Sequence, residues 1–438
     1  MNREILRIAL PAIIANITIP LLGLIDTGIA GHLGSTVFIG AMAVGSMMFS
    51  LVYWNFSFLR MGTSGITAQA YGAGNKEAAF HTLYRVSALA LMIAIALIAL
   101  QYPIQWIALK IIGPSEEVAS FARSYFYIVV WGAPAMLIMM GIKGWFLGMQ
   151  DSTRPMMISI MVNVLDIMIC LFAVFVLHKG FIGIAIGTLA AEYLGLVFSI
   201  ILLRLRYGKE LKETALMGII NFADIKRLFR VNSDIFFRSV MMLGVTLTFM
   251  AIGARSGNLV LAVNSLIMQL FLLYSYFMDG FGFAGEALAG RFTGAEDNQR
   301  LAKCIKYLFG WGAAVMVLFA ALYLCASRQI FTLLTNEMPV ITLAMDYRFW
   351  TAAIPIAGMA AFIWDGIYIG LTATRGMLLA SLMGCSTFFA IYFIPIGAMS
   401  NSRLWAAFIA YLLMRGAVQT VIYLLRRERL IGQPKERA

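Results

Sequence analysis

Twelve long apolar runs dominate this sequence of 438 residues. Each is about twenty residues or longer and almost free of charge, which is what an α-helix needs to cross a hydrocarbon core of roughly 30 Å. Membrane β-strands alternate polar and apolar residues over about ten positions, a pattern that these runs lack. The sequence therefore predicts an all-α integral membrane protein with spans near 5–30, 37–64, 79–101, 118–147, 154–177, 181–204, 231–254, 259–288, 304–326, 340–371, 376–398 and 404–425.

Basic residues are concentrated in the loops after the even-numbered spans and at both ends of the chain. Loops after odd-numbered spans hold few of them, so the positive-inside rule predicts that both termini are cytoplasmic, in an inner or plasma membrane. The formal net charge of +12 is then a signal of topology and not of nucleic-acid binding. The four cysteines lie far apart without a CxxC pattern, which favours packed side chains over disulfides or metal ligands.

The chain repeats itself across a polar segment near its middle. GWFLGMQDSTRP begins at Gly144 and GIYIGLTATRG begins at Gly366, 222 residues later. Gly148 and Gly370 have the same separation. Two halves of six spans share one orientation, so a pseudo-two-fold axis along the membrane normal is expected, with sites near the midplane. We predict an N-terminal six-helix bundle at 1–205, a cytoplasmic linker at 206–230, and a C-terminal six-helix bundle with a basic cytoplasmic tail at 231–438.

One acid, Asp26, lies inside the first apolar run, in IPLLGLIDTGIAGHLG. A charged side chain at the centre of a membrane helix costs about 2.5–3.5 kcal/mol on insertion scales, so such a residue normally faces a cavity or a partner. Its default interpretation is a proton or cation site. The alternative is a structural acid that pairs with a basic residue to hold two helices together.

Further polar residues of the first half could join Asp26 in one pocket. On the fifth span they occur at i, i+3 and i+7, hence on one helical face, and on the sixth span they are one turn apart. Two neighbouring acids in a low dielectric do not both ionise easily, which is suited to carrying a proton. These candidates are Asn163, Asp166, Cys170, Thr188 and Glu192.

The second half also contains charged residues within its spans. Asp234 and Arg238 have the i, i+4 spacing that favours a salt bridge, with a structural or a functional role. Asp365 lies well inside the tenth span and is the second functional candidate. Asp279 and Glu286 are expected on a solvated face near the cytoplasmic end. Three basic residues near cytoplasmic ends are expected to reach the interface through their long stems, namely Arg60, Lys143 and Arg415.

The first span ends in IDTGIAGHLG, QAYGAGN follows the second span, and GMQDSTRP lies between the fourth and fifth. Together these motifs resemble the multidrug and toxic compound extrusion (MATE) family. NSDIFFRS (232–239) and WDGIYIGLTATR (364–375) resemble its DinF-like branch. The resemblance covers essentially the whole chain. It implies two six-helix bundles forming a V around a central cavity, and export of substrates from the cytoplasm in exchange for protons or sodium ions.

The same resemblance implies an ion site at Asp26 and Thr188. The family usually has an Asn on the fifth span with an Asp four residues later. Here Asp166 takes the Asn position and Cys170 the Asp position, which moves one carboxylate by roughly 6 Å along the helix. This departure weakens the case for a sodium site formed by Asp26, Asp166 and Thr188. It favours the proton as the coupling ion. Asp365 matches an acid used for ion coupling in another branch.

The leading hypothesis is a cation-coupled antiporter, with the proton favoured and sodium as the alternative, that exports amphipathic, mostly cationic organic compounds. We expect a monomer in a lipid bilayer, with small-molecule organic substrates, no cofactor and no nucleic-acid partner. A flippase for a lipid-linked precursor is the alternative, and it would need a basic central cavity. An enzyme is not expected, because the three histidines, at span ends, form neither HxxxxD nor HExxH.

Overall fold

The computed structural model describes residues 1–33, 35–214, 221–394 and 400–431, with side chains to residue 425. Every regular element in these ranges is a helix, so the all-α prediction is confirmed for the described chain. The predicted basic tail lies largely outside this part: Lys435 and Arg437 are beyond it, and the side chains of Arg426, Arg427 and Arg429 are not described.

The helices are α1 (Asn2–Gly31), α2 (Thr36–Tyr53), η1 (Trp54–Ser57), α3 (Phe58–Gly72), α4 (Lys76–Ala99), α5 (Gln101–Ile112), α6 (Glu116–Val129), η2 (Val130–Gly132), α7 (Ala133–Gly148), α8 (Thr153–Leu171), η3 (Phe172–Val176), α9 (Phe181–Glu213), α10 (Phe222–Arg255), α11 (Asn258–Gly294), α12 (Asn298–Cys325), α13 (Ser327–Leu334), α14 (Met338–Asp346), α15 (Arg348–Gly370), α16 (Thr374–Phe393) and α17 (Asn401–Ile431).

All twelve predicted spans correspond to helical segments long and apolar enough to cross a membrane. The second span combines α2, η1 and α3, and the fourth combines α6, η2 and α7. The tenth span, expected from residue 340, begins at Arg348, because α14 forms a separate short helix before it. The short helices α5 and α13 were not anticipated from the sequence. The segment assigned to a linker, 206–230, is mostly helical, since α9 runs to Glu213 and α10 starts at Phe222.

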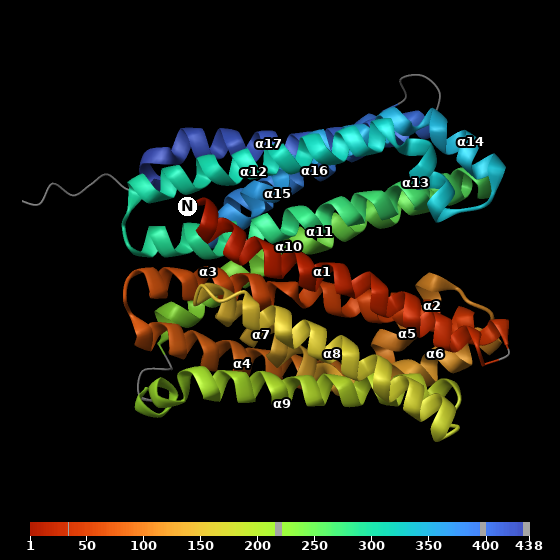
Figure 1. Cartoon of the computed structure of the whole chain (residues 1–438), viewed down its shortest axis with the longest axis horizontal. Helices are drawn as coiled ribbons and strands as arrows, with labels where there is room; N and C mark the ends of the chain where they lie inside the picture. Colours follow the sequence, from red (N-terminus) through yellow and green to blue (C-terminus); the bar gives the residue numbers. More distant parts are fainter. Residues whose placement is uncertain (34, 215–220, 395–399, 432–438) are drawn as a thin grey trace, which may run out of the picture. The chain divides into compact units, whose positions relative to one another are not determined.

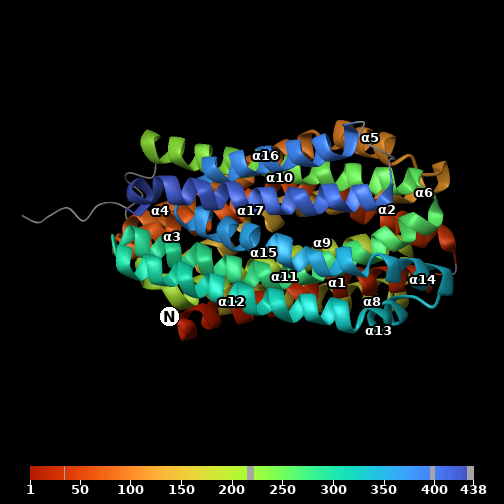
Figure 2. The same cartoon turned by 90° about the horizontal axis from the view of Figure 1, so that it is seen from above.

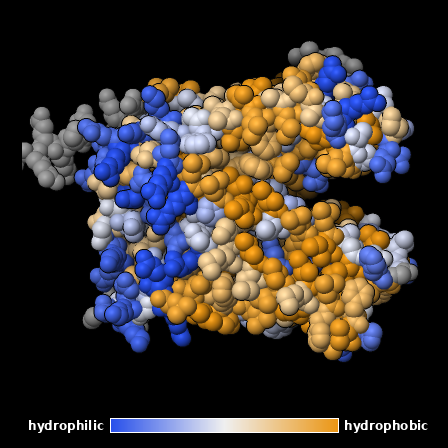
Figure 3. All heavy atoms as spheres, in the orientation of Figure 1, coloured by the Kyte–Doolittle hydropathy of each residue, from blue (hydrophilic) through white to orange (hydrophobic). Residues whose placement is uncertain are grey.

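The chain divides into two compact units. The N-terminal unit comprises 14–70 and 75–229, and the C-terminal unit comprises 1–13, 71–74 and 230–438. Within each unit the long helices lie roughly side by side (Figures 1 and 2). On the face of each unit seen in Figure 3, the middle is hydrophobic, and hydrophilic residues gather toward the ends, most densely where α4 and α12 begin. This banding within each unit is typical of membrane-spanning bundles.

The internal repeat is visible in equivalent close contacts between helices. In the N-terminal unit, a Cβ on Gly144 of α7 would collide with the backbone of Arg60 on α3. In the C-terminal unit, a Cβ on Gly366 of α15 would collide with the backbone of Gly282 on α11 in the same way. Both glycines therefore let two backbones cross at a distance that no larger residue permits.

Helix caps repeat as well. Asn75 caps α4 by accepting a hydrogen bond from the backbone N–H of Ala78 at 2.9 Å. Asp297 caps α12 by accepting one from the N–H of Arg300, also at 2.9 Å. Each cap satisfies a backbone donor that the first helical turn leaves free. The repeat predicted from sequence is therefore present in the packing and capping of both halves.

Candidate functional site

Three buried polar side chains of the N-terminal unit converge inside the span region. Asp26 comes from α1, and Asp166 and Cys170 come from successive turns of α8. A carboxylate oxygen of each acid and the Cys170 sulfur all lie within 4.8 Å of one another. The exposed fractions of the three residues are only 6%, 3% and 0%. The structure therefore brings together three of the residues that the sequence singled out.

Asp166 is held by two donors from its own unit. The Oγ1 hydroxyl of Thr188 on α9 donates to Oδ1 of Asp166 at 3.2 Å. The thiol of Cys170 lies 3.1 Å from the same oxygen and 3.4 Å from the carbonyl oxygen of Ile184. Thr188 thus lies beside Asp166, with its hydroxyl bonded to that carboxylate.

The backbone of α9 approaches this site closely because of a glycine. A Cβ on Gly187 would lie 2.8 Å from the backbone nitrogen of Cys170 and would also collide with its sulfur. Because Gly187 has a hydrogen in place of a methyl group, α8 and α9 can approach each other where Thr188 bonds to Asp166. The sequence did not distinguish this glycine from the many others in the spans.

Two carboxylate oxygens in this region lack a donor. Among the described residues, neither Oδ1 of Asp26 nor Oε2 of Glu192 has a hydrogen-bond partner, although both atoms are buried. Buried polar atoms are paired in the large majority of cases, and an unpaired anionic oxygen is costly. Both carboxylates are therefore suited to binding a proton or a cation.

Glu192 lies in the same electrostatic region as the other acids. Its carboxylate fills the space beside η2 that a Cβ on Gly132 would take. It interacts electrostatically with Asp166 and with the hydroxyl of Tyr53, a buried group that has no hydrogen-bond partner among the described residues. Tyr125 of α6 interacts with Asp26, Asp166 and Glu192. Sequence reasoning missed both tyrosines, because tyrosines in apolar runs are common at interfaces and helix contacts.

Asn163 bonds to a threonine of α1. Its side-chain amide donates to Oγ1 of Thr18 on α1 at 2.7 Å. It therefore links α8 to α1 three residues before Asp166, through a hydroxyl and not through an acid. The expected common face of α8 exists, but Asn163 occupies a separate part of it.

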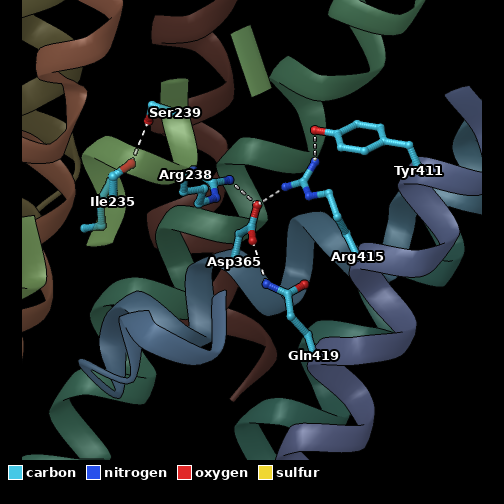
Figure 4. Close-up of polar contacts among 7 residues, drawn as sticks. All are labelled: Ile235, Arg238, Ser239, Asp365, Tyr411, Arg415 and Gln419. Carbon is cyan, nitrogen blue, oxygen red and sulfur yellow. Dashed lines mark hydrogen bonds and ion pairs between the residues drawn. The ribbon is translucent and has the colours of Figure 1, made fainter. Parts of the chain in front are cut away.

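In the C-terminal unit, Asp365 of α15 lies at the centre of a buried cluster (Figure 4). Its Oδ2 accepts from Arg238 of α10 and, at 2.6 Å, from Nη2 of Arg415 on α17. Its Oδ1 accepts from the amide of Gln419 at 2.7 Å. Arg415 also donates to the hydroxyl of Tyr411 at 3.2 Å. We call the five residues Arg238, Asp365, Tyr411, Arg415 and Gln419 the Asp365 cluster.

This cluster corrects two expectations. Within the described chain, the ion pair of Arg238 is with Asp365, and Asp234 instead accepts a hydrogen bond from Thr374 at 2.7 Å. The i, i+4 spacing would allow Arg238 to pair with Asp234. The structure instead places Asp365, on a neighbouring helix, within reach of Arg238. Arg415 does not reach the interface. It is 2% exposed, because Asp365 and Tyr411 accept its donors inside the bundle.

A third expectation also changes, since Glu286 is 2% exposed and does not lie on a solvated face. It belongs to the tightly packed segment of α11 that meets α15. A Cβ on Gly370 would lie 2.7 Å from the Glu286 carbonyl oxygen. Helical periodicity placed Glu286 correctly on one face with Asp279 but could not identify the helix covering that face.

The donor set at Asp26 fits a proton or a hard cation. Two carboxylates and the Thr188 hydroxyl supply oxygen ligands of the kind that hard cations prefer. Cys170 supplies a softer sulfur, which suits hydrogen bonding to Asp166 better than coordination of sodium. The Asp26, Asp166 and Thr188 oxygens are the groups that would hold sodium if it binds here.

Comparison with known proteins identifies the family. The MatE family model matches residues 11–172 and 235–396, so it covers most of each half. A protein from Escherichia coli named DNA damage-inducible protein F is 35% identical over 427 residues, 96% of this chain and 92% of that protein. A Vibrio vulnificus protein named multidrug resistance protein NorM is 24% identical, over 80% of this chain and 77% of its own length.

Solved structures show the same fold. The Vibrio cholerae MATE transporter VcmN in its bent form matches with a TM-score of 0.86 at 15% identity, over 98% of both chains. A MOP superfamily transporter from Pyrococcus furiosus matches with a TM-score of 0.83 at 16% identity, over 98% of this chain and 96% of that one. With twelve apolar helices long enough to span a membrane, the chain belongs to the multidrug and toxic compound extrusion (MATE) family of membrane transporters and is not an enzyme.

Proposed function

We propose that this chain is a cation-coupled antiporter that exports amphipathic, mostly cationic organic compounds by alternating access. The observation that carries the proposal is the unpartnered buried oxygen of Asp26, within 4.8 Å of Asp166 and Cys170. A carboxylate in this setting gains most from binding a proton or a cation, and intramembrane acids in transporters commonly have that role. The name of the NorM relative agrees with export of drugs.

The coupling residues that we assign are all in the N-terminal unit: Asp26, Asn163, Asp166, Cys170, Thr188 and Glu192. Asp26 binds the ion. Thr188 and Cys170 hold Asp166 in place beside it through their hydrogen bonds. Asn163 ties α8 to α1, so that a change in α1 on ion binding is transmitted to α8. Asp365 is not in this set, because two guanidinium groups already neutralise its charge.

We propose the proton as the coupling ion and place both termini on the cytoplasmic side of the inner membrane. The protein works as a monomer. The cycle begins when the outward-facing state takes up a proton at Asp26, which displaces the substrate to the outside. The inward-facing state then releases the proton to the cytoplasm. Each charge moving down the potential contributes about 2.3 kcal/mol per 100 mV.

A flippase for a lipid-linked precursor is a second candidate. It requires basic residues that can hold a pyrophosphate, and the buried guanidinium groups of Arg238 and Arg415 are an observation in its favour. The acids at Asp26 and Asp166 are not needed for that activity. Gradient dependence therefore separates the two candidates.

The test is efflux of a fluorescent organic cation from proteoliposomes, with a proton gradient or a sodium gradient imposed separately. We expect the proton gradient alone to drive efflux by the wild type and not by Asp26→Asn. Asp346→Asn, which changes an exposed acid at the end of α14, is the control and should behave as the wild type. Efflux driven only by the sodium gradient would mean that sodium, and not the proton, is the coupling ion. Full activity of Asp26→Asn would overturn the assignment of the site, and no gradient-driven efflux would favour the flippase.

A further inference from the structure

The Asp365 cluster contains more positive than negative charge. Two guanidinium groups, of Arg238 and Arg415, surround one carboxylate, and the exposed fractions of the two arginines are 6% and 2%. The charged and titratable groups that act on the Tyr411 hydroxyl are these two arginines, Asp365 and the Cys385 thiol. Among the described residues, no second acid acts on it. Counting its five members, two arginines and one carboxylate, the cluster carries a net charge of one positive unit inside the C-terminal unit.

Hydrogen-bond donors in the cluster are also in excess. Each guanidinium group has five N–H donors, whereas Asp365 and Tyr411 accept three bonds from the two groups in total. Within the described chain, the Nε atoms of Arg238 and Arg415 are buried without a hydrogen-bond partner. A buried cation without a counter-charge or acceptor is strongly unfavourable. In Figure 4 both side chains point toward Asp365 from opposite sides.

We propose that Arg238 and Arg415 form a binding site for a monovalent anionic group in the C-terminal unit, and that its ligand is the carboxylate of an amphipathic substrate. A carboxylate matches the fork of a guanidinium group and supplies acceptors for the free donors. One negative charge balances the net charge of the cluster, whereas a pyrophosphate would exceed it. The substrate part of this inference rests on the proposed export function.

Asp365 then has a definite role. Its carboxylate accepts from both arginines and keeps them in place. A substrate carboxylate competes with it for the same donors. Removing Asp365 should therefore tighten anion binding, whereas removing either arginine should weaken it. A cluster that only fastened α10, α15 and α17 together would show no such opposite effects.

The first experiment measures thermal unfolding of the purified full-length protein with benzoate, an aromatic carboxylate. Controls are benzyl alcohol, which has the ring without the charge, and chloride at equal ionic strength. We expect saturating benzoate to raise the Tm of the wild type by about 2 °C or more, as ligand binding to the folded state does, and benzyl alcohol to have no such effect. An equal effect of chloride that the arginine variants lose would overturn the carboxylate assignment and identify a small inorganic anion as the ligand.

The variants give the decisive comparison. Arg238→Gln and Arg415→Gln should lose the benzoate shift, and Asp365→Asn should show a larger shift than the wild type. Asp234→Asn is the matched control, since Asp234 is one turn from Arg238 on α10 but bonds to Thr374. If Arg415→Gln does not fold, Arg415→Lys retains the charge, loses the fork and should weaken the shift. The same benzoate shift in all variants, no shift in the wild type, or a smaller shift in Asp365→Asn would overturn the proposal.

A second experiment connects the site to transport. Proteoliposomes are loaded with a rhodamine dye that has a free carboxylate, or with the methyl ester of the same dye. We expect the wild type to export the free acid at lower concentrations than the ester, and Arg238→Gln to remove this preference. Export of neither dye would count against the proposed function, whereas the benzoate shift would still decide the anion site. Export of both dyes with the same preference in Arg238→Gln would refute the role of the anion site and leave the export function in place.

Discussion

The Oγ1 hydroxyl of Thr188 lies 3.2 Å from Oδ1 of Asp166, so α9 is joined to α8 at an acid beside Asp26. The family resemblance leads us to expect Asp166 at a position where the family usually has an Asn. In this chain the Thr188 hydroxyl bonds to the residue at that position, Asp166.

Loss of the Thr188 hydroxyl should alter coupling without removing a carboxylate. A hydrogen bond to a charged group contributes about 1.5–3 kcal/mol, which corresponds to about tenfold or more in an equilibrium constant. Because the donated bond stabilises the ionised carboxylate of Asp166, we expect Thr188→Val to lower the proton concentration needed for half-maximal efflux about tenfold, and Thr188→Ser to restore it. Efflux measured at a series of imposed gradients tests this. Wild-type ion dependence in Thr188→Val would show that the bond to Asp166 is not part of coupling.

Exchanging the polar residues of α8 should alter the preference for the ion. The double variant Asp166→Asn with Cys170→Asp keeps the number of carboxylates and recreates the order implied by the family resemblance. It replaces a soft sulfur near Asp26 with oxygen, which hard cations prefer. We expect sodium-driven efflux to appear or increase in the double variant. Cys170→Ser, which retains a donor to Asp166, is the control and should keep the ion preference of the wild type.

The close contact at Gly187 predicts a loss of stability on adding one methyl group. A Cβ there would collide with Cys170, and overpacking of this kind typically costs about 1–3 kcal/mol. We expect Gly187→Ala to lower the Tm of the purified protein and to impair ion-driven efflux. Gly244→Ala is the matched control, because a Cβ at Gly244 of α10 would have nothing within 4 Å. Helix propensity favours Ala over Gly, so the control should be neutral or slightly stabilising. Equal Tm values for the two variants would mean that α8 and α9 adjust freely at this contact.

The predicted orientation has a reporter in the native sequence. Cys325, at the end of α12, is exposed, whereas Cys170, Cys304 and Cys385 are buried. With cytoplasmic termini, the end of the ninth span faces the outside. We expect a membrane-impermeant maleimide to label the protein in intact cells, and Cys325→Ser to abolish this labelling. Labelling of Cys325 only after the cells are opened would reverse the orientation.

The repeat was predictable from sequence because the close contacts of Gly144 and Gly366 leave a direct trace in residue type. Only glycine fits where two backbones cross, so the same spacing of glycines recurs in both halves. Asp26 could be singled out as a candidate for a similar reason. A single acid in a long apolar run is costly, so its presence there is enough to indicate a site.

Arg415 and Tyr125 have surroundings that residue type and position in the sequence do not reveal. Arg415 lies near the end of a span, where a long basic side chain ordinarily reaches the interface, yet it is buried against Asp365. Tyr125 has the residue type of an interface aromatic, yet it neighbours the acids of the N-terminal unit. In both cases the deciding partners are on helices distant in the chain, which residue type and spacing do not identify.

By itself the sequence determined the membrane class, the twelve spans, the repeat and the acids that are candidates for ion coupling, because hydrophobicity, glycine spacing and isolated charges are local properties. Only the tertiary structure decided the partner of each charge: Thr188 for Asp166, Asp365 instead of Asp234 for Arg238, and no described donor for one oxygen of Asp26. The reason is physical. A side chain on a helix pairs with whichever group its neighbouring helices bring within about 3 Å, and that distance depends on how the helices pack.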